Sequence, residues 1–253
     1  MVKIILCGCG GHMGHVVTDI VAADQDTEIV AGIDLAGAQG QDYPVFTDIA
    51  ACDVQADALI DFSSPKALDG ILDYCVKNNV PAILCTTGYT QEQMDQIHEA
   101  GKKVAMMKSA NMSLGVNMLL KLLKTAAKTL APAGFDIEIV EKHHNLKVDA
   151  PSGTALAMAD SINEALGNSY HYKYDRSQGR VRRDPHEIGI SAVRGGNIVG
   201  EHEVIFAGLD EIVEFKHTAY SKGVFAKGAV QAAKFMAGKP AGFYDMGDVI
   251  GEI

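Results

Sequence analysis

The sequence predicts a two-domain α/β protein, in which an N-terminal domain with a doubly wound parallel sheet is followed by a C-terminal α+β domain with an open mixed sheet. Two observations support this fold class. Short, continuous apolar runs alternate with segments of helical spacing over about the first hundred residues, which is typical of a parallel sheet covered on both faces. Beyond residue 113 this alternation stops, and successive strand-like runs favour antiparallel or mixed pairing.

Five apolar runs are predicted to form the parallel sheet of the first domain. They lie at residues 2–7, 28–33, 58–62, 81–85 and 103–107. The stretches between them carry apolar residues at helical spacing, so we expect covering helices at 12–23, 66–77 and 91–101.

Residues 113–131 are predicted to form one long amphipathic helix. Its expected apolar stripe consists of Leu114, Met118, Leu119, Leu122, Leu123 and Ala126. The other expected elements of this half are a strand at 135–140, a helix at 154–166, and strands at 187–193, 201–206 and 211–217. Because the helical segment 224–236 resembles those of the first half, we expect domains at residues 1–112 with 223–253 and at 113–222.

Composition limits the partners and the location of the chain. The formal net charge of −10 disfavours binding to nucleic acid, whose phosphates would be repelled. No run of about 18 apolar residues exists, so no membrane-spanning segment is expected. The start MVKIILCGCGGHMG has too short an apolar run for a signal peptide, and we expect a cytoplasmic protein.

The cysteines are odd in number and scattered, so we expect buried, reduced thiols and not disulfides or zinc ligands. They are Cys7, Cys9, Cys52, Cys75 and Cys85.

A glycine cluster follows the first predicted strand and opens the first predicted helix, at Gly8, Gly10, Gly11 and Gly14. Glycine lets the backbone turn tightly and approach a pyrophosphate, while the helix N-terminus supplies amide donors. The spacing fits GxxGxxG and not GxGxxG, since Met13 stands where the last glycine belongs. A tight turn without a ligand would use the same glycines. Asp34, however, ends the second strand about 20 residues later, where an acid binds ribose hydroxyls, so together the features predict a Rossmann-like dinucleotide site.

Asp34 also predicts a preference for NADH over NADPH. Its carboxylate would repel a 2′-phosphate, which needs a nearby arginine or lysine, and residues 35–39 supply neither. Use of NADPH remains possible.

Two further loops follow predicted strands at the edge where ligands bind in open parallel sheets. One contains Ser63 and Ser64, and the other contains Thr86 and Thr87. The threonines are candidates to contact the nicotinamide end of a cofactor. All four hydroxyls could equally cap the helices that follow, and the sequence leaves both interpretations open.

The densest group of reactive side chains lies in the segment EKHHNLKVDAPSGTA, after the strand predicted at 135–140. Its reactive residues are His143, His144, Lys147, Ser152, Gly153 and Thr154. A Ser-Gly-Thr turn at a helix start offers hydroxyls and amides that suit a carboxylate, and lysine adds a positive charge. Histidine is the group best placed to give or take a proton near neutral pH. The segment therefore predicts a site for a small acidic substrate whose reduction needs a proton as well as a hydride.

Two rival chemistries fit this segment less well. Adjacent histidines rarely reach one ion, and no HExxH-type spacing is present, so we expect no metal. No GxSxG elbow surrounds Ser152, which argues against a Ser/His/Asp hydrolase.

Several motifs spread along the chain match one enzyme family. They are GCGGHMG, HHNLKVDAPSGTA and SAVRGGNIVGEHEVIF, with further matches at TTG (86–88) and SANMSLGVNM (109–118). On these motifs the chain resembles the 4-hydroxy-tetrahydrodipicolinate (dihydrodipicolinate) reductases. The resemblance covers essentially the whole chain, and the HHxxKxDAPSGTA signature is highly specific.

The resemblance implies a homotetrameric oxidoreductase of the diaminopimelate route to lysine, which removes water from cyclic 4-hydroxy-tetrahydrodipicolinate and reduces it to tetrahydrodipicolinate. Residues 1–112 and 223–253 would bind the dinucleotide, and 113–222 would bind substrate and form the oligomer. NADH would deliver hydride to a conjugated carbon–carbon double bond, and His143 would supply the proton, with Lys147 as its catalytic partner.

The resemblance also implies the binding residues. His144, Gly153 and Thr154 would hold the substrate carboxylates, together with Ser152 of the same turn. The implied cofactor contacts are Gly8, Cys9, Gly10, Gly11, His12, Met13, Asp34, Cys85, Thr86, Thr87, Ser109, Ala110, Asn111 and Met112.

Four positions depart from the family pattern. Arginines that bind the NADPH phosphate are common at the places of His12 and Leu35, so their absence also favours NADH. Cys85 stands where glycine is usual, and Met112 where an aromatic residue is common.

Some features stay open at this stage. The basic run of Arg180, Arg182 and Arg183 is expected to be a solvated loop without an assigned role. Two other functions remain as alternatives: another NAD-dependent dehydrogenase of a small dicarboxylate, and a non-catalytic NADH-binding sensor.

Overall fold

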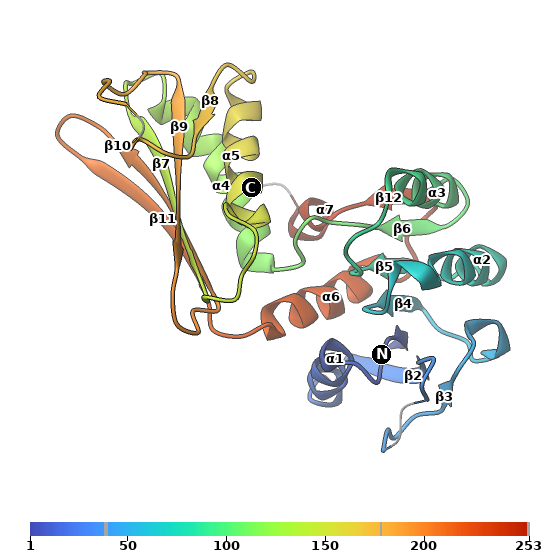
Figure 1. The fold of residues 1–253 in the computed structure, drawn as a ribbon. Helices are drawn as coiled ribbons and strands as arrows, with labels where there is room; N and C mark the ends of the chain where they lie inside the picture. Colours follow the sequence, from blue (N-terminus) through green and yellow to red (C-terminus); the bar gives the residue numbers. More distant parts are fainter. Residues whose placement is uncertain (38–39, 178, 252–253) are drawn as a thin grey trace. The chain divides into compact units, whose positions relative to one another are not determined.

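The structure, a computed structural model, describes residues 1–37, 40–177 and 179–251, and its chain divides into two units (Figure 1). Unit 1 consists of Met1–Leu114 and Gly223–Gly251, and unit 2 of Gly115–Lys222. A parallel sheet in unit 1 and a mixed sheet with helices in unit 2 confirm the predicted fold class. Among the described residues, no helix combines the length and apolarity needed to cross a bilayer.

Seven parallel strands form the sheet of unit 1, in the order β12-β6-β5-β4-β1-β2-β3. Their bounds are β1 Val2–Cys7, β2 Thr27–Ile33, β3 Val45–Phe46, β4 Ala58–Asp61, β5 Ala82–Leu84, β6 Ala105–Met107 and β12 Gly242–Tyr244. The strand order reverses beside β1, with β2 and β3 on one side and the others on the opposite side. In sheets of this kind, ligands bind in the crevice at such a reversal.

Helices cover both faces of this sheet. They are α1 His12–Ala22, α2 Leu68–Asn78, α3 Gln91–Gly101, α6 Gly223–Met236 and α7 Met246–Ile250, with the 3₁₀ turns η1 Ile49–Ala51 and η2 Pro65–Ala67. Because side chains alternate along a strand, Ile4 and Leu6 of β1 pack with α1 and α6, whereas Ile5 and Cys7 pack with α2 and α3. A strand buried on both faces must be apolar at every position, which explains the continuous apolar runs of the sequence.

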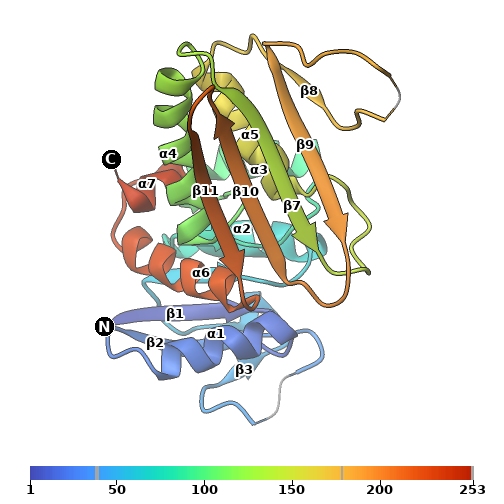
Figure 2. The ribbon, with the colours of Figure 1, turned by 90° about the vertical axis from the view of Figure 1, so that its left-hand side faces the viewer.

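Five strands form the sheet of unit 2, in the order β11-β10-β7-β9-β8 (Figure 2). Their bounds are β7 Asp136–His143, β8 His171–Lys173, β9 Glu187–Arg194, β10 Gly200–Ala207 and β11 Ile212–Ala219. Strand β10 is antiparallel to β7 and β11, and β9 is parallel to β7 and β8. Helices α4 Leu114–Leu130 and α5 Gly153–Ala165 lie on the same face of the sheet, where Ile139 and Phe206 pack in the core of the unit.

The end of β7 differs from the prediction. The strand continues past residue 140 to His143, because residues 141–143 keep their parallel pairing with β9. Glu141 and His143 therefore share the buried face of the strand, and neither lies in a loop.

The predicted apolar stripe of α4 is wrong at two positions. The buried residues of the helix are Val116, Asn117, Leu119, Leu123 and Ala127. Met118 and Leu122 are exposed instead. Two apolar ridges run along this helix, and periodicity alone does not indicate which of them faces the sheet.

Short elements were not predicted, since β3, β8, β12 and α7 are too brief to show a period. All five cysteines are buried and none forms a disulfide, as expected.

Replacing Gly228 by alanine is expected to destabilise unit 1. The new Cβ would lie 1.7 Å from the carbonyl oxygen of Met112, so α6 would have to move. We expect the free energy of unfolding, measured by urea denaturation, to fall by about 2 kcal/mol. The control is Gly70→Ala in α2, where the Cβ would make ordinary contact with Ile49 at 3.5 Å and helix propensity favours alanine. An equal loss in both variants would contradict this account.

Candidate active site

The glycine loop joins β1 to α1 at the reversal of strand order. Gly8 has a φ of +78°, and a Cβ there would lie 2.6 Å from the carbonyl oxygen of Phe62. A Cβ at Gly14 would lie 2.3 Å from the carbonyl oxygen of Gly8, so Gly14 allows α1 to approach the loop. In the described chain, Gly11 caps α1 without a side-chain hydrogen bond. The amides of the first helical turn are therefore suited to an anion such as a pyrophosphate.

Asp34 is tied to this loop through its carboxylate. Oδ2 accepts a hydrogen bond from the amide of Gly10 at 3.0 Å, and Oδ1 accepts one from the amide of Ala36 at 3.0 Å. The carboxylate is thus fixed beside the loop, where the ribose hydroxyls of a dinucleotide bind in this fold. Residues 35–39 contain no lysine or arginine, and two of them, Ala38 and Gln39, lie outside the described residues.

A cavity of about 650 Å³ opens beside the glycine loop, a volume typical of cofactor pockets. Its lining includes Gly8, Gly11, Asp34, Ser63, Ser64 and Lys66. Lys66 is exposed and makes no salt bridge with any described residue, so it supplies a cation on the same cavity as Asp34. Sequence alone does not connect this lysine with Asp34, because 32 positions separate the two residues in the chain.

The two serines of the β4 loop have structural partners. The Ser64 hydroxyl accepts a hydrogen bond from the amide of Lys66 and so caps η2. The Ser63 hydroxyl donates to the buried carboxylate of Asp61, which also accepts a hydrogen bond from the Tyr89 hydroxyl at 3.0 Å. The capping interpretation therefore accounts for Ser64, while Ser63 stabilises the loop.

The two threonines of the β5 loop do not cap the next helix, because Thr90 forms the capping box of α3. Thr87 is exposed, whereas Thr86 is buried. Thr86 Oγ1 has no hydrogen-bond partner in the described chain. Buried hydroxyls are normally paired, so a polar group of a ligand would satisfy this atom.

Some implied cofactor residues have side chains in the core of unit 1, namely Cys9, Cys85 and Met112. They could contact a cofactor mainly through their backbone. Among the others, His12 and Ala110 are exposed, and Met13 packs partly against the same core. The Ser109 hydroxyl accepts a weak hydrogen bond from the Met246 amide at 3.5 Å, and Asn111 Oδ1 accepts one from the Ser113 amide at 2.8 Å.

In unit 2, the carboxylate of Glu141 lies at the centre of the candidate chemistry and is completely buried. Arg194 of β9 donates two hydrogen bonds to it, Nη1 to Oε2 and Nη2 to Oε1, both at 2.7 Å. His143 Nδ1 lies 2.6 Å from Oε2, and the amide of Ser152 donates to Oε1 at 2.9 Å. Burial alone would raise the pKa of Glu141, but the hydrogen bonds from Arg194, His143 and Ser152 hold that pKa below its ordinary value.

His202 of β10 completes this group. Its Nε2 lies 2.9 Å from the Ser152 hydroxyl, and its ring meets the edge of the His143 ring with centroids 5.0 Å apart. Burial, reinforced by the neighbouring His143, lowers the pKa of His202 to about 4, so its imidazole is neutral at pH 7. The Ser152 hydroxyl also accepts a hydrogen bond from the Ala155 amide at 3.2 Å, which caps α5.

The other predicted residues lie in the loop after β7 and in the first turn of α5. Lys147 pairs with Asp149 at 2.8 Å, which keeps the pKa of the Asp149 carboxyl low. His144 and Thr154 are half-buried, and Gly153 is exposed at the start of α5. Glu141, Arg194 and His202 were not selected from the sequence. The sequence did carry a signal for Glu141. Residues two positions apart on one strand point to the same face, so Glu141 shares the face of His143.

Two family models together match nearly the whole chain. Residues 2–112 match "Dihydrodipicolinate reductase, N-terminus", and residues 115–250 match "Dihydrodipicolinate reductase, C-terminus". The chain belongs to the dihydrodipicolinate reductase family. The resemblance found from the sequence motifs is therefore confirmed.

Curated relatives and a solved structure agree with this membership. Proteins named 4-hydroxy-tetrahydrodipicolinate reductase are 50% identical over 250 residues in Clostridium novyi and 49% identical over 246 residues in Clostridium tetani. The matches cover 99% and 97% of this chain and 98% and 96% of those proteins. A dipicolinate-bound dihydrodipicolinate reductase from Paenisporosarcina sp. TG-14 has the same fold, with a TM-score of 0.81, 24% identity and 97% coverage of both chains.

The basic run before β9 was expected to be a solvated loop, but one of its arginines is largely buried. Arg180 and Arg182 are exposed, but the guanidinium of Arg183 is largely buried. It pairs with Asp136 at 2.8 Å and with Glu138 at 3.0 Å, and it donates to three backbone carbonyl groups. Arg183 therefore anchors its loop to the start of β7, and that part of the expectation is wrong.

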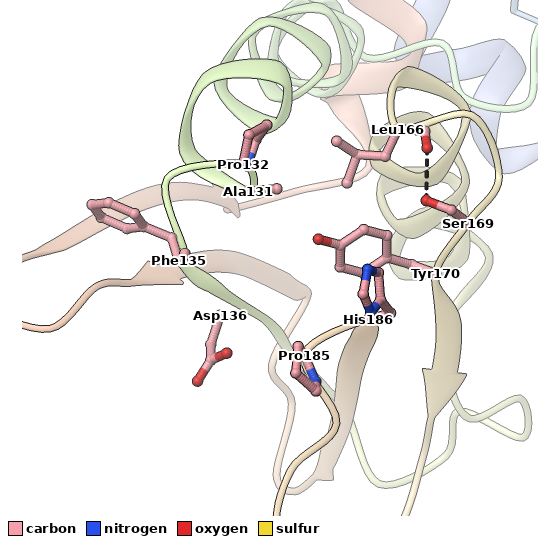
Figure 3. A pocket seen from close by; sticks show the side chains of 10 residues that line it. Ala131, Pro132, Phe135, Asp136, Leu166, Ser169, Tyr170, Pro185 and His186 are labelled. Carbon is pink, nitrogen blue, oxygen red and sulfur yellow. Dashed lines mark hydrogen bonds between the residues drawn. The ribbon is translucent and has the colours of Figure 1, made fainter.

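A second cavity, of about 420 Å³, lies at the other end of β7 (Figure 3). Its labelled residues include Asp136, Tyr170 and His186, and the Ser169 hydroxyl donates to the Leu166 carbonyl group. Asp136 and His143 are seven positions apart on an extended strand, which separates them by roughly 23 Å. No residue predicted for the site lies in this cavity, so the candidate active site of unit 2 is the group around His143.

Acidification is expected to destabilise unit 2 through His202. Its folded-state pKa lies below the unfolded value, so the unfolded chain binds the proton first as the pH falls from 6.5 towards 4. Stability is therefore present above pH 6.5 and is lost over this window. His202→Gln should reduce the loss between pH 7.5 and 4.5 by about 2 kcal/mol in urea denaturation. The control variant is His186→Gln, because the His186 side chain is exposed. An unchanged pH dependence in His202→Gln would contradict this account.

Proposed function

We propose that this chain catalyses the NAD(P)H-dependent reduction of 4-hydroxy-tetrahydrodipicolinate to tetrahydrodipicolinate, with loss of water, in the diaminopimelate route to lysine. The observation that carries the proposal is His143, a buried imidazole held at Nδ1 by a carboxylate and set beside the start of α5. Family membership and the names of the relatives support the same reaction.

The cofactor would be held by residues 1–112 with 223–253. Bound NADH or NADPH supplies the hydride. The amides at the start of α1 would receive the pyrophosphate, and Asp34 would receive the ribose hydroxyls, as the glycine loop and the adjoining cavity suggest. Thr86, whose buried hydroxyl lacks a partner in the described chain, is suited to a polar group of the cofactor. The remaining proposed contacts are those implied by the family, including Thr87 and residues 109–112.

The substrate would be held by residues 113–222. Gly153 and Thr154 open α5, and no acidic residue lies in the first turn of that helix, so its amide end suits a carboxylate. His144 would hold the second carboxylate. The Ser152 hydroxyl already pairs with His202 and the Ala155 amide, so its contribution would be mainly to hold this turn in place. The dipicolinate named in the solved relative is itself a ring with two carboxylates.

His143 would supply the proton. Its Nδ1 is engaged by Glu141, so the proton would leave from Nε2. A Cβ on Gly200 would lie 3.2 Å from Nε2, and the glycine leaves that space open. Lys147, paired here with Asp149, would assist by favouring negative charge on the substrate.

We also propose a cytoplasmic homotetramer built through unit 2. Helices α4 and α5 lie on one face of its sheet, and no helix of the described part of this unit lies on the other face (Figure 1). That open face includes the exposed Ile212 and Val193, which suits contact with further copies of the chain.

Replacing His143 by glutamine is expected to lower kcat by about 100-fold or more, since a positioned acid contributes that much to a reaction needing a proton. NADH affinity, measured by fluorescence titration, should stay within about twofold of the unmodified protein. Activity is followed by NADH absorbance with enzymatically generated substrate. His186→Gln is the matched control, because His186 lies in the same unit but away from the site. Full turnover by His143→Gln would rule out this proton donor, and a non-catalytic sensor would show no turnover with any variant.

NADH is expected to be preferred over NADPH, by about tenfold in kcat/KM, because the carboxylate of Asp34 disfavours a 2′-phosphate. The preference is incomplete because Lys66 lines the same cavity. Lys66→Ala should therefore lower kcat/KM for NADPH and leave that for NADH nearly unchanged. A strong preference for NADPH in the unmodified protein would overturn the assignment.

A further inference from the structure

Two strands and a helix start converge on one carboxylate in unit 2. Both oxygens of Glu141 receive two donors each: Oε1 from Arg194 and the Ser152 amide, and Oε2 from Arg194 and His143. Every acceptor site of the buried carboxylate is thus used. Removing a charge from water is costly, and the two-point contact with the guanidinium is what allows this carboxylate to stay ionised.

The ionised carboxylate determines where His143 carries its proton. An ionised carboxylate can only accept hydrogen bonds, so the contact of 2.6 Å requires a proton on Nδ1. In the neutral ring, Nε2 then bears the free electron pair, and it is Nε2 that gains and gives the second proton. Nε2 is also the nitrogen beside Gly200, where the structure leaves room.

Arg194 is itself held firmly. Beyond Glu141, Nη1 donates to the Val193 carbonyl oxygen at 2.8 Å and Nη2 to that of Asp149 at 2.6 Å. Its guanidinium therefore links β9 to the loop that carries Lys147. Arg194 therefore holds the Glu141 carboxylate, and that carboxylate in turn holds the His143 ring.

The other groups facing His143 add little net charge. His202 on β10 is neutral at pH 7, and burial also lowers the pKa of His217 on β11. Lys147 in the loop after β7 is paired with Asp149. The charged groups that act most directly on the His143 ring are therefore Glu141, which contacts it, and Arg194, which contacts Glu141.

We propose that Glu141 and Arg194 act as a pair of positioning residues for proton transfer, in which Glu141 fixes the Nδ1–H form of His143 and Arg194 keeps Glu141 ionised. The proposal rests on the proposed role of His143 as proton donor. As the substrate takes up hydride, the Nε2–H bond breaks, a bond from that hydrogen to substrate carbon forms, and the electron pair stays on Nε2. Glu141 stabilises the imidazolium before this step, and Arg194 keeps Glu141 ionised so that it can do so. A proton from water then restores the imidazolium.

The pH dependence of kcat separates this role from a purely structural one. A general acid acts only in its protonated form, so turnover should fall as the pH rises. In Glu141→Gln the imidazolium loses its carboxylate, so the fall should move to lower pH by about one unit, with kcat about tenfold lower. In Arg194→Met the buried carboxylate loses the cation that keeps it ionised, so it no longer stabilises the imidazolium and the fall should also move to lower pH by about one unit. A shift to higher pH in either variant, or an activity loss without a shift, would overturn the proposal.

The same strand offers matched controls for these two variants. Glu138 of β7 pairs with Arg176, which reproduces a carboxylate–guanidinium contact near the other end of the strand. Glu138→Gln and Arg176→Met should leave the pH profile unchanged. A shift in these variants as large as in Glu141→Gln would show a nonspecific charge effect and overturn the proposal.

A measurement on the unmodified protein keeps the proposal testable if either variant fails to fold. Nitrogen-15 NMR of labelled histidines, assigned with His143→Gln, should place the proton of neutral His143 on Nδ1. A proton on Nε2 would overturn the proposal, whatever the activity of the variants. The two failures are distinguishable, because full turnover by His143→Gln would remove the proton donor, whereas an Nε2–H ring in an enzyme that needs His143 would remove only the positioning pair.

Discussion

The contact between Glu141 and Arg194 is the interaction on which the chemistry of unit 2 depends. A carboxylate with no exposed surface would be neutral or destabilising without a cation, and the guanidinium supplies one with two parallel hydrogen bonds. The same carboxylate binds the amide of Ser152, which starts α5, and the ring of His143, which ends β7. One ion pair therefore joins the end of the sheet, the start of a helix and the candidate proton donor.

In unit 1, the candidate cofactor site depends mainly on the conformation of the backbone and less on charged side chains. Its candidate cofactor site requires a chain that approaches a ligand closely, and glycines at the reversal of strand order provide this approach. The apolar strands behind them are buried on both faces and keep the loop in one position. Asp34 then adds one fixed carboxylate, bound to the loop through the Gly10 amide.

The sequence was sufficient for most of the fold because long elements carry a clear period and buried parallel strands are apolar throughout. It was insufficient where a choice depends on a partner distant in sequence. Met118 and Leu122 belong to an apolar ridge that the sheet does not cover. The sequence pointed to His143 because histidine is suited to proton transfer. Arg194 and His202 lie on other strands, whose register relative to β7 cannot be predicted from the local sequence pattern. Lys66 reaches the Asp34 cavity from a different strand loop.

The return of the chain to unit 1 has a consequence for how the protein is made. Helix α6 supplies a large part of the core beside β1 and α1, and β12 adds the last strand at the edge of the sheet. A ribosome releases these residues only after all of unit 2 has been synthesised. Until then, the apolar sheet face that α6 covers is protected only in part, by α1, and unit 2 can complete its fold first. Chaperone binding during synthesis would accordingly be directed to the nascent N-terminal half.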